Sequence, residues 1–98
     1  MKKFIVSIDA GTTSNRSILF DLKGKPIYSS QKEFTQYFPK SGWVEHDPDE
    51  IWKTTIKTLR DVITKAKKIR GKILSIGITN QRETTVLWDS KTGKPVYK

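Results

Sequence analysis

The sequence predicts an α/β protein in which three strands precede one long helix and two further strands follow it. Two strand-like apolar runs near the N-terminus, residues 3–8 and 16–21, are joined by a polar segment that contains one glycine. A helix signal begins at Asp47, where an N-cap residue is followed by proline. Apolar residues then recur over several turns with the 3.6-residue period of an α-helix. After the helix, residues 73–79 are apolar at most positions, which is typical of a strand covered on both faces.

The first turn has an unusual content for a hairpin. Asp9–Arg16 holds one carboxylate, one glycine, three consecutive hydroxyls and one arginine. Gly11 allows a ligand to approach the backbone closely, and hydroxyls with turn amides are suited to phosphate oxygens. Asp9 could hold Mg²⁺ through water. Arg16 adds a permanent positive charge on a planar guanidinium, whose geometry is suited to oxyanions. An ordinary Thr/Ser-rich turn explains the same spacing. No Gly-Lys-Ser/Thr follows, as a Walker loop needs, and no helix follows, as a dinucleotide fingerprint needs.

Residues 26–34 predict the third strand, with Pro26 at its first position, where a missing N–H matters least. An antiparallel meander is the simplest arrangement of these three strands. Residues 36–46 predict a polar, aromatic-rich loop.

The helix signal is the clearest in the chain. Asp47 suits the N-cap, Pro48 the first helical position, and Glu50 completes a capping box. Gly71 is expected to end the helix. The expected buried stripe consists of Ile51, Trp52, Ile56, Leu59, Val62, Ile63, Ala66 and Ile69.

The last part of the chain predicts a fourth strand at residues 73–79, a polar turn at 80–83 and a fifth strand at 84–88. A single helix can cover only one face of the sheet. We therefore expect the second cover to lie in sequence outside these 98 residues, so that the chain is the N-terminal piece of a larger protein.

Composition narrows the class of protein. The 98 residues include no cysteine, which excludes a disulfide framework and a thiolate zinc site and fits a reducing cytosol. The N-terminal apolar run is broken by Asp9, so it is too short for a signal peptide or a membrane span.

The net charge of +9 suggests nucleic acid or another anion as a partner. The cluster at Lys65–Lys72 falls where the helix ends, where it complements the helix dipole, and we interpret the charge as mainly a solvated surface. A small basic nucleic-acid-binding module remains the alternative.

Three stretches carry a resemblance to a known family: Asp9–Arg16, Gly42–Pro48 and Gly77–Thr85. Together they resemble the FGGY carbohydrate kinases, within the actin, heat-shock chaperone and sugar-kinase superfamily, and most closely the glycerol-phosphorylating members. The resemblance implies a ribonuclease H-like, actin-like ATPase fold with an incomplete mixed sheet. Residues 1–98 are then the N-terminal part of the first kinase domain, and the second domain is absent. It also implies a cytoplasmic, homo-oligomeric enzyme that uses ATP and Mg²⁺ to phosphorylate glycerol, with no nucleic-acid partner and no membrane span.

The resemblance assigns roles residue by residue. Thr12, Thr13 and Ser14 match the nucleotide-phosphate turn, Thr12 also lies near the transferred phosphoryl group, and Arg16 matches a nucleotide-side arginine. Asp9 matches the residue that serves Mg²⁺. The chain departs from the family at Ala10, where Gln is frequent, and at Asn15, where Ser is frequent; neither change removes a proposed contact.

The acceptor site of the family matches Arg82 and Glu83, which would bind the glycerol hydroxyls. The chemistry is suitable, since a guanidinium donates and a carboxylate accepts. An exposed turn pair of little energetic value is the alternative reading of these two residues. The catalytic base of the family is an Asp downstream, and no residue of this chain matches it. We expect His46 and the three tryptophans, Trp43, Trp52 and Trp88, to be structural residues.

Overall fold

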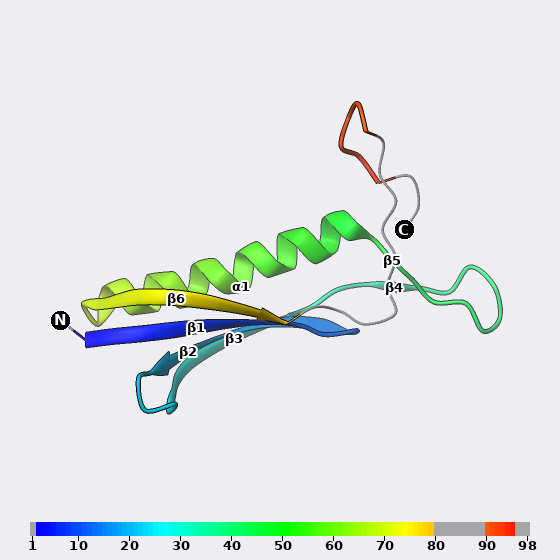
Figure 1. Cartoon of the computed structure of the whole chain (residues 1–98). Helices are drawn as coiled ribbons and strands as arrows, with labels where there is room; N and C mark the ends of the chain where they lie inside the picture. Colours follow the sequence, from blue (N-terminus) through cyan, green and yellow to red (C-terminus); the bar gives the residue numbers. More distant parts are fainter. Residues whose placement is uncertain (1, 80–89, 96–98) are drawn as a thin grey trace.

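The chain folds as a mixed sheet with one long helix packed along it (Figure 1). The structure, a computed structural model, describes residues 2–79 and 90–95. The elements are β1 (Lys2–Ala10), β2 (Ser14–Asp21), β3 (Pro26–Glu33), β4 (Gln36–Tyr37), β5 (Glu45–His46), α1 (Pro48–Lys68) and β6 (Gly71–Thr79). Among the described residues, no helix combines the length and apolar character needed to cross a bilayer.

The main sheet has the strand order β3-β2-β1-β6. β1 pairs antiparallel with β2, and β2 pairs antiparallel with β3, which confirms the predicted meander. β6 returns after the helix and pairs parallel with β1, so the sheet is mixed. β4 and β5 form a separate two-stranded ribbon within the segment that the sequence predicted to be a loop. The predicted fifth strand at 84–88 lies outside the described residues.

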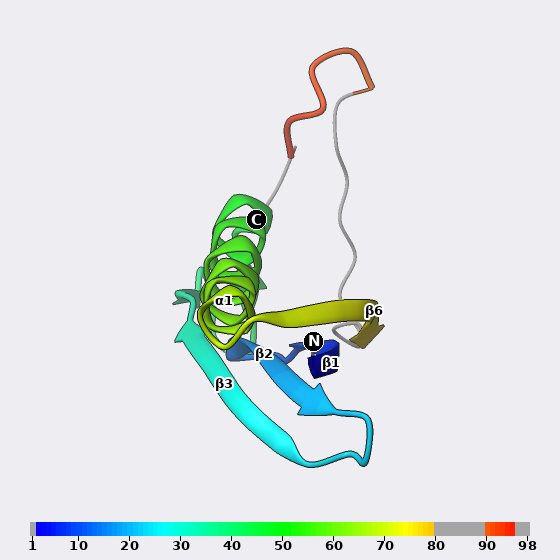
Figure 2. The same ribbon diagram turned by 90° about the vertical axis from the view of Figure 1, so that its left-hand side faces the viewer.

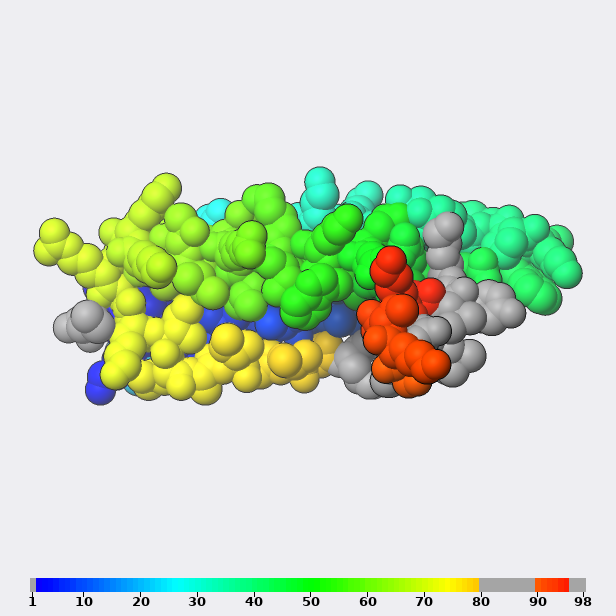
Figure 3. Space-filling view, turned by 90° about the horizontal axis from the view of Figure 1, so that it is seen from above, coloured from blue at the N-terminus to red at the C-terminus, as the bar shows by residue number. Residues whose placement is uncertain are grey.

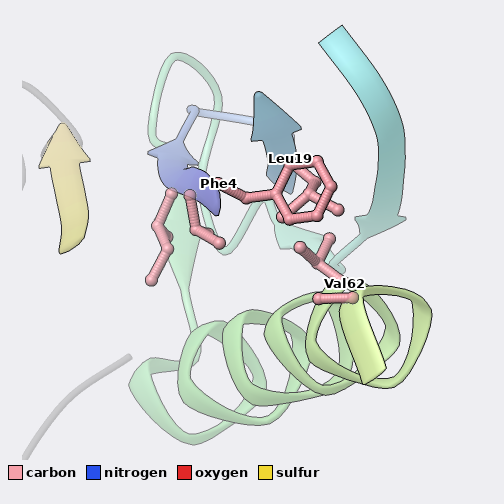
Figure 4. Packing of buried hydrophobic residues seen from close by; sticks show 6 residues of the cluster. Phe4, Leu19 and Val62 are labelled. Atoms are coloured by element: carbon pink, nitrogen blue, oxygen red, sulfur yellow. The ribbon is translucent and has the colours of Figure 1, made fainter. Parts of the chain in front are cut away.

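The core lies between α1 and one face of the sheet (Figure 2). Alternate residues of the strands point toward the helix, as the two-residue period of a strand requires. Figure 4 shows Phe4 and Leu19 from adjacent strands directed toward Val62 of the helix. The buried cluster consists of Phe4, Val6, Ile8, Leu19, Val62 and Ala66, with Leu59, Ile69 and Ile73 packed against it.

The start of α1 agrees with the prediction, and its end does not. Asp47 is the N-cap, and its carboxylate accepts a hydrogen bond from the Asp49 amide at 3.0 Å, as predicted. The prediction that Gly71 ends the helix is wrong, because Arg70 adopts the left-handed conformation (φ 54°) and Gly71 already begins β6. Glycine is needed at 71 for another reason: a Cβ there would lie 2.0 Å from Cε2 of Phe4.

The open side of the sheet lies along β6. Ile76 and Ile78 pair in register with Val6 and Ile8, yet they are 46% and 73% exposed because α1 lies nearer to β2 and β3. Figure 3 shows atoms of β1 between the helix and β6 on this side. Within the described residues, the apolar character expected of a doubly covered strand is therefore present without the cover.

Candidate functional site

The turn between β1 and β2 is a tight hairpin end with two hydroxyls at its tip. The strands pair as far as Ala10 and Asn15, and the Gly11 amide then donates to the Ser14 carbonyl at 3.0 Å. Thr12 and Thr13 lie beyond this bond and are exposed. A Cβ on Gly11 would lie 2.9 Å from the Ser14 carbonyl oxygen, so glycine permits the turn to close. The predicted strand–turn–strand arrangement is confirmed.

Buried polar contacts attach this hairpin to the first half of α1. Asn15 is fully buried, and its Nδ2 donates to the Ile51 carbonyl at 2.9 Å and to Thr54 Oγ1 at 2.6 Å. One step along the same face of β2, the hydroxyls of Ser17 and Thr58 are 3.0 Å apart. The departure from the family pattern at Asn15 therefore lies on the helix side of the strand, away from the tip of the turn.

Thr54 and Thr58 were not among the residues expected to face the sheet. The prediction that Trp52 belongs to the buried stripe is wrong, because Trp52 is 64% exposed. The buried residues of α1 are Thr54, Thr58, Val62 and Ala66. Their regular spacing of four residues is a helix-face signal that an apolar-only criterion overlooks. Polar residues are suitable here because they meet the polar residues of β2.

The predicted site residues of the described chain gather at one end of the sheet. Arg16 and Ser14 both contact Gln31 of β3, which the sequence analysis did not select: Arg16 donates to Gln31 Oε1 at 3.3 Å, and Gln31 Nε2 donates to Ser14 Oγ at 2.8 Å. Asp9 accepts from Thr79 Oγ1 at 3.1 Å. Arg82 and Glu83, the proposed acceptor pair, lie outside the described residues, as does Trp88.

The donor set at this end is suited to Mg²⁺ bound mainly through water. The described residues contain no group of three or more His, Cys, Asp and Glu side chains that could hold a metal ion. Asp9 contributes one exposed carboxylate at the end of β1. Mg²⁺ keeps several waters and is often held by one or two carboxylates together with substrate phosphates, so a single Asp beside a turn rich in hydroxyls fits this ion.

The structure also has an apolar cavity with a basic rim, and it lies at the other end of β1. This cavity of about 390 Å³ is lined by Lys2, Lys3, Phe4, Asp21, Leu22, Lys23, Ile27 and Ile69. Residues distant in sequence meet here, since the start of β1, the β2–β3 turn, the end of α1 and the start of β6 lie together (Figure 1). The fold thus brings together Lys2, Lys3 and Lys23, and it places them away from the turn between β1 and β2.

The shifted pKa values belong to contacts that hold the fold. A hydrogen bond from Lys57 and another from Ser30 lower the pKa of Asp61. The Ser30 bond connects β3 to α1, whereas Lys57 lies one turn before Asp61 within α1. Tyr37 donates a hydrogen bond to Glu50, and this bond raises the pKa of Tyr37. The same bond connects β4 to the start of α1.

Two of the residues expected to be structural differ in their surroundings. His46 packs edge-on against Phe34, with ring centroids 5.0 Å apart, as a structural residue would. Trp43 is 53% exposed and lies in the loop between β4 and β5, with the Lys40 ammonium 4.7 Å from its ring centroid, so it is not a core residue.

Comparison with protein families gives a match over nearly the whole chain. Residues 4–98 match the model of the N-terminal domain of the FGGY family of carbohydrate kinases. The chain is 59% identical over 97 residues to a glycerol kinase of Alkaliphilus metalliredigens, covering 99% of this chain and 19% of that protein. It is 57% identical to a glycerol kinase of Petrotoga mobilis, covering 99% of this chain and 20% of the relative.

Solved structures give the same fold. A crystal structure of Plasmodium falciparum glycerol kinase with ADP matches with a TM-score of 0.85 and 37% identity, over 98% of this chain and 19% of that one. A gluconate kinase from Lactobacillus acidophilus matches with a TM-score of 0.85 and 28% identity, over 98% of this chain and 19% of that one. The chain spans about one fifth of the length of the curated relatives that it matches.

Proposed function

Because this chain belongs to the FGGY family of carbohydrate kinases, we propose that it is the N-terminal part of an enzyme that phosphorylates glycerol with ATP. The observation that carries the proposal is the 59% identity to a glycerol kinase over 97 residues, a stretch that includes both Asp9–Arg16 and Arg82–Glu83. The hairpin geometry supports it independently, since exposed hydroxyls, one guanidinium and one carboxylate converge at the end of the sheet.

The proposed roles follow from the chemistry of the side chains. Phosphoryl transfer depends mainly on positioning and on neutralising charge. Thr12, Thr13 and Ser14 would donate hydrogen bonds to phosphate oxygens, with Thr12 also next to the transferred group. Arg16 would neutralise nucleotide phosphate charge, and Asp9 would hold Mg²⁺ through water. The bound Mg²⁺ would supply further neutralisation of the phosphates.

The acceptor would be held by the pair Arg82 and Glu83. Glycerol hydroxyls both donate and accept, so a guanidinium next to a carboxylate can fix one hydroxyl in line with the transferred phosphoryl group. The general base that takes the hydroxyl proton is proposed to be an Asp downstream of these residues. A second domain, also outside the chain, would bind adenine and close over the site.

The remaining parts of the proposal concern the whole protein. Residues 1–98 would form the N-terminal part of its first kinase domain, and the complete enzyme would be a cytoplasmic homo-oligomer without a nucleic-acid partner. The absence of cysteine in these residues supports a reducing compartment.

The test is product identification with the complete protein that begins with these residues. Incubation with ATP, Mg²⁺ and, separately, glycerol, xylulose or gluconate should yield glycerol 3-phosphate and only slow phosphorylation of the two sugars. Faster phosphorylation of xylulose or gluconate than of glycerol would contradict the substrate assignment while retaining the family.

One observation would suit the alternative function, a nucleic-acid-binding module. Lys2, Lys3 and Lys23 lie around one cavity at the end of the sheet opposite the β1–β2 turn, and we call this part the basic end. That function predicts binding whose affinity falls steeply as salt rises. We expect no saturable binding of labelled DNA or RNA at physiological salt, and fluorescence anisotropy measures this directly. Tight, salt-sensitive binding would add a second function.

A further inference from the structure

Four side chains, one from each strand of the main sheet, form a row across its end. The strand register pairs Thr79 with Asp9, Asp9 with Arg16, and Arg16 with Gln31. The residues on either side of Arg16 in β2 are buried against α1, so the row lies on the opposite face.

The two central residues of the row carry opposite charges but do not pair. Directly opposed residues of antiparallel strands are close enough to interact, and opposite charges there attract. Within residues 2–79 and 90–95, however, Asp9 and Arg16 do not form an ion pair within 4.0 Å, whereas Lys57 and Asp61 do. Each central residue is held from its outer side instead: Thr79 donates to Asp9 at 3.1 Å, and Arg16 donates to Gln31 at 3.3 Å.

Gln31 acts on a second residue through the other end of its amide. Its Nε2 donates to Ser14 Oγ at 2.8 Å. The orientation of this amide is fixed, because a guanidinium has no acceptor and must face the carbonyl oxygen. Ser14 therefore accepts from Gln31, and its own hydroxyl hydrogen remains available to donate. Phosphate oxygens need such donors.

We propose that Gln31 is a positioning residue of the phosphate site, an inference that rests on the proposed function. It keeps Arg16 from closing onto Asp9, so that the guanidinium stays available to phosphate and the carboxylate to Mg²⁺. It also keeps Ser14 a donor. Thr79 holds Asp9 from the other side of the row. An ion pair between Asp9 and Arg16 would remove both charges from their ligands at once.

The test is ATP binding to the complete protein by calorimetry, first in EDTA and then with Mg²⁺. Gln31 is exposed, so Gln31→Leu should leave the thermal melt unchanged. We expect about tenfold weaker ATP binding in EDTA, because Arg16 turns to Asp9 and one ordered donor is lost. Asp9→Asn should then restore more affinity in the Gln31→Leu background than it adds to the wild type, since it releases Arg16.

Two further variants separate the effect of the row from a general effect of removing a glutamine. Gln36→Leu makes the same change on β4, outside the row, and should leave ATP affinity unchanged. Gln31→Glu keeps the acceptor for Arg16 but not the donor to Ser14; it should weaken ATP binding without rescue by Asp9→Asn, and it replaces Gln31→Leu if that variant does not fold. Equal ATP affinity in wild type and Gln31→Leu, or rescue of equal size in both backgrounds, would overturn the positioning role. A wild type that binds no ATP would overturn the proposed function and this inference with it.

Discussion

Substitution of Gly11 tests the proposed role of the turn between β1 and β2 in binding ATP, because the contacts of an added Cβ are known. Replacement by valine places a Cβ 2.9 Å from the Ser14 carbonyl oxygen, which is backbone and cannot rotate away. The turn must therefore open, and the hydrogen bond from the Gly11 amide to that carbonyl, now 3.0 Å, is lost or stretched. Thr12 and Thr13 lie between these two atoms in the chain, so their hydroxyls move with the turn.

The size of the effect follows from two contributions. Loss of one hydrogen bond costs about 1 kcal/mol, and backbone strain in a tight turn costs about 1–3 kcal/mol. If the bound state alone requires the closed turn, the two together weaken ATP binding by roughly 30- to 1000-fold. The fold should survive, because the turn lies outside the buried cluster of Phe4, Leu19 and Val62.

The assay combines ATP titration by calorimetry with a thermal melt of the complete protein. Gly71→Ala is the contrasting variant, because its Cβ would meet the Phe4 ring inside the core. Gly71→Ala should lower the melting temperature, while Gly11→Val should weaken ATP binding with a nearly unchanged melt. Wild-type ATP affinity and turnover in Gly11→Val would refute the assignment of this turn to the nucleotide.

The remaining predictions test the acceptor pair, the core, a helix–sheet contact and the completeness of the site. Glu83→Gln should lower kcat/KM for glycerol by about one to two decades, since a charge-assisted hydrogen bond contributes about 1.5–3 kcal/mol, with ATP affinity unchanged; an equal loss for ATP would argue against the acceptor role. Leu19→Ala, at a fully buried position, should destabilise the protein by about 2–5 kcal/mol in denaturant unfolding, whereas exposed Leu22→Ala should change stability by less than about 0.5 kcal/mol. Because its pKa is lowered in the folded state, Asp61 stabilises the protein at neutral pH, and this contribution is lost as the pH falls below the ordinary value of 3.8; the stability difference between wild type and Asp61→Asn should therefore shrink in acid unfolding below that pH. Residues 1–98 alone should form no glycerol 3-phosphate from ATP, Mg²⁺ and glycerol, and a cooperative melt together with turnover would show that these residues are sufficient.

The elements with strong local signals were predictable from sequence. The hairpin around Gly11 and the N-cap at Asp47 depend on short-range chemistry, so residue types and spacing were enough. The end of α1 was not predictable, because Gly71 is required by the Phe4 ring, a contact between residues far apart in sequence. Arg70 then takes the left-handed position that glycine was expected to fill.

The charged and hydroxyl residues of the proposed site stand out in the sequence, whereas the residues that hold them in place do not. Asp9 and Arg16 flank a recognisable turn, but Gln31 becomes relevant only when β3 pairs with β2 in register. Asn15 and Thr54 were missed for a similar reason, since a buried polar pair is visible only from both sides of the helix–sheet interface. The basic end likewise depends on strand order, which brings Lys2 and Lys23 together.

Hydrogen exchange of the complete protein reports whether the turn between β1 and β2 binds the phosphates of ATP. Backbone amides of residues 11–16 should gain protection on addition of ATP, while those of the β2–β3 turn at residues 22–25, beside the basic cavity, should not change. Glycerol alone should protect the segment around Arg82 and Glu83 instead. ATP-dependent protection at residues 22–25 with none at residues 11–16 would show that the nucleotide does not bind at the turn between β1 and β2.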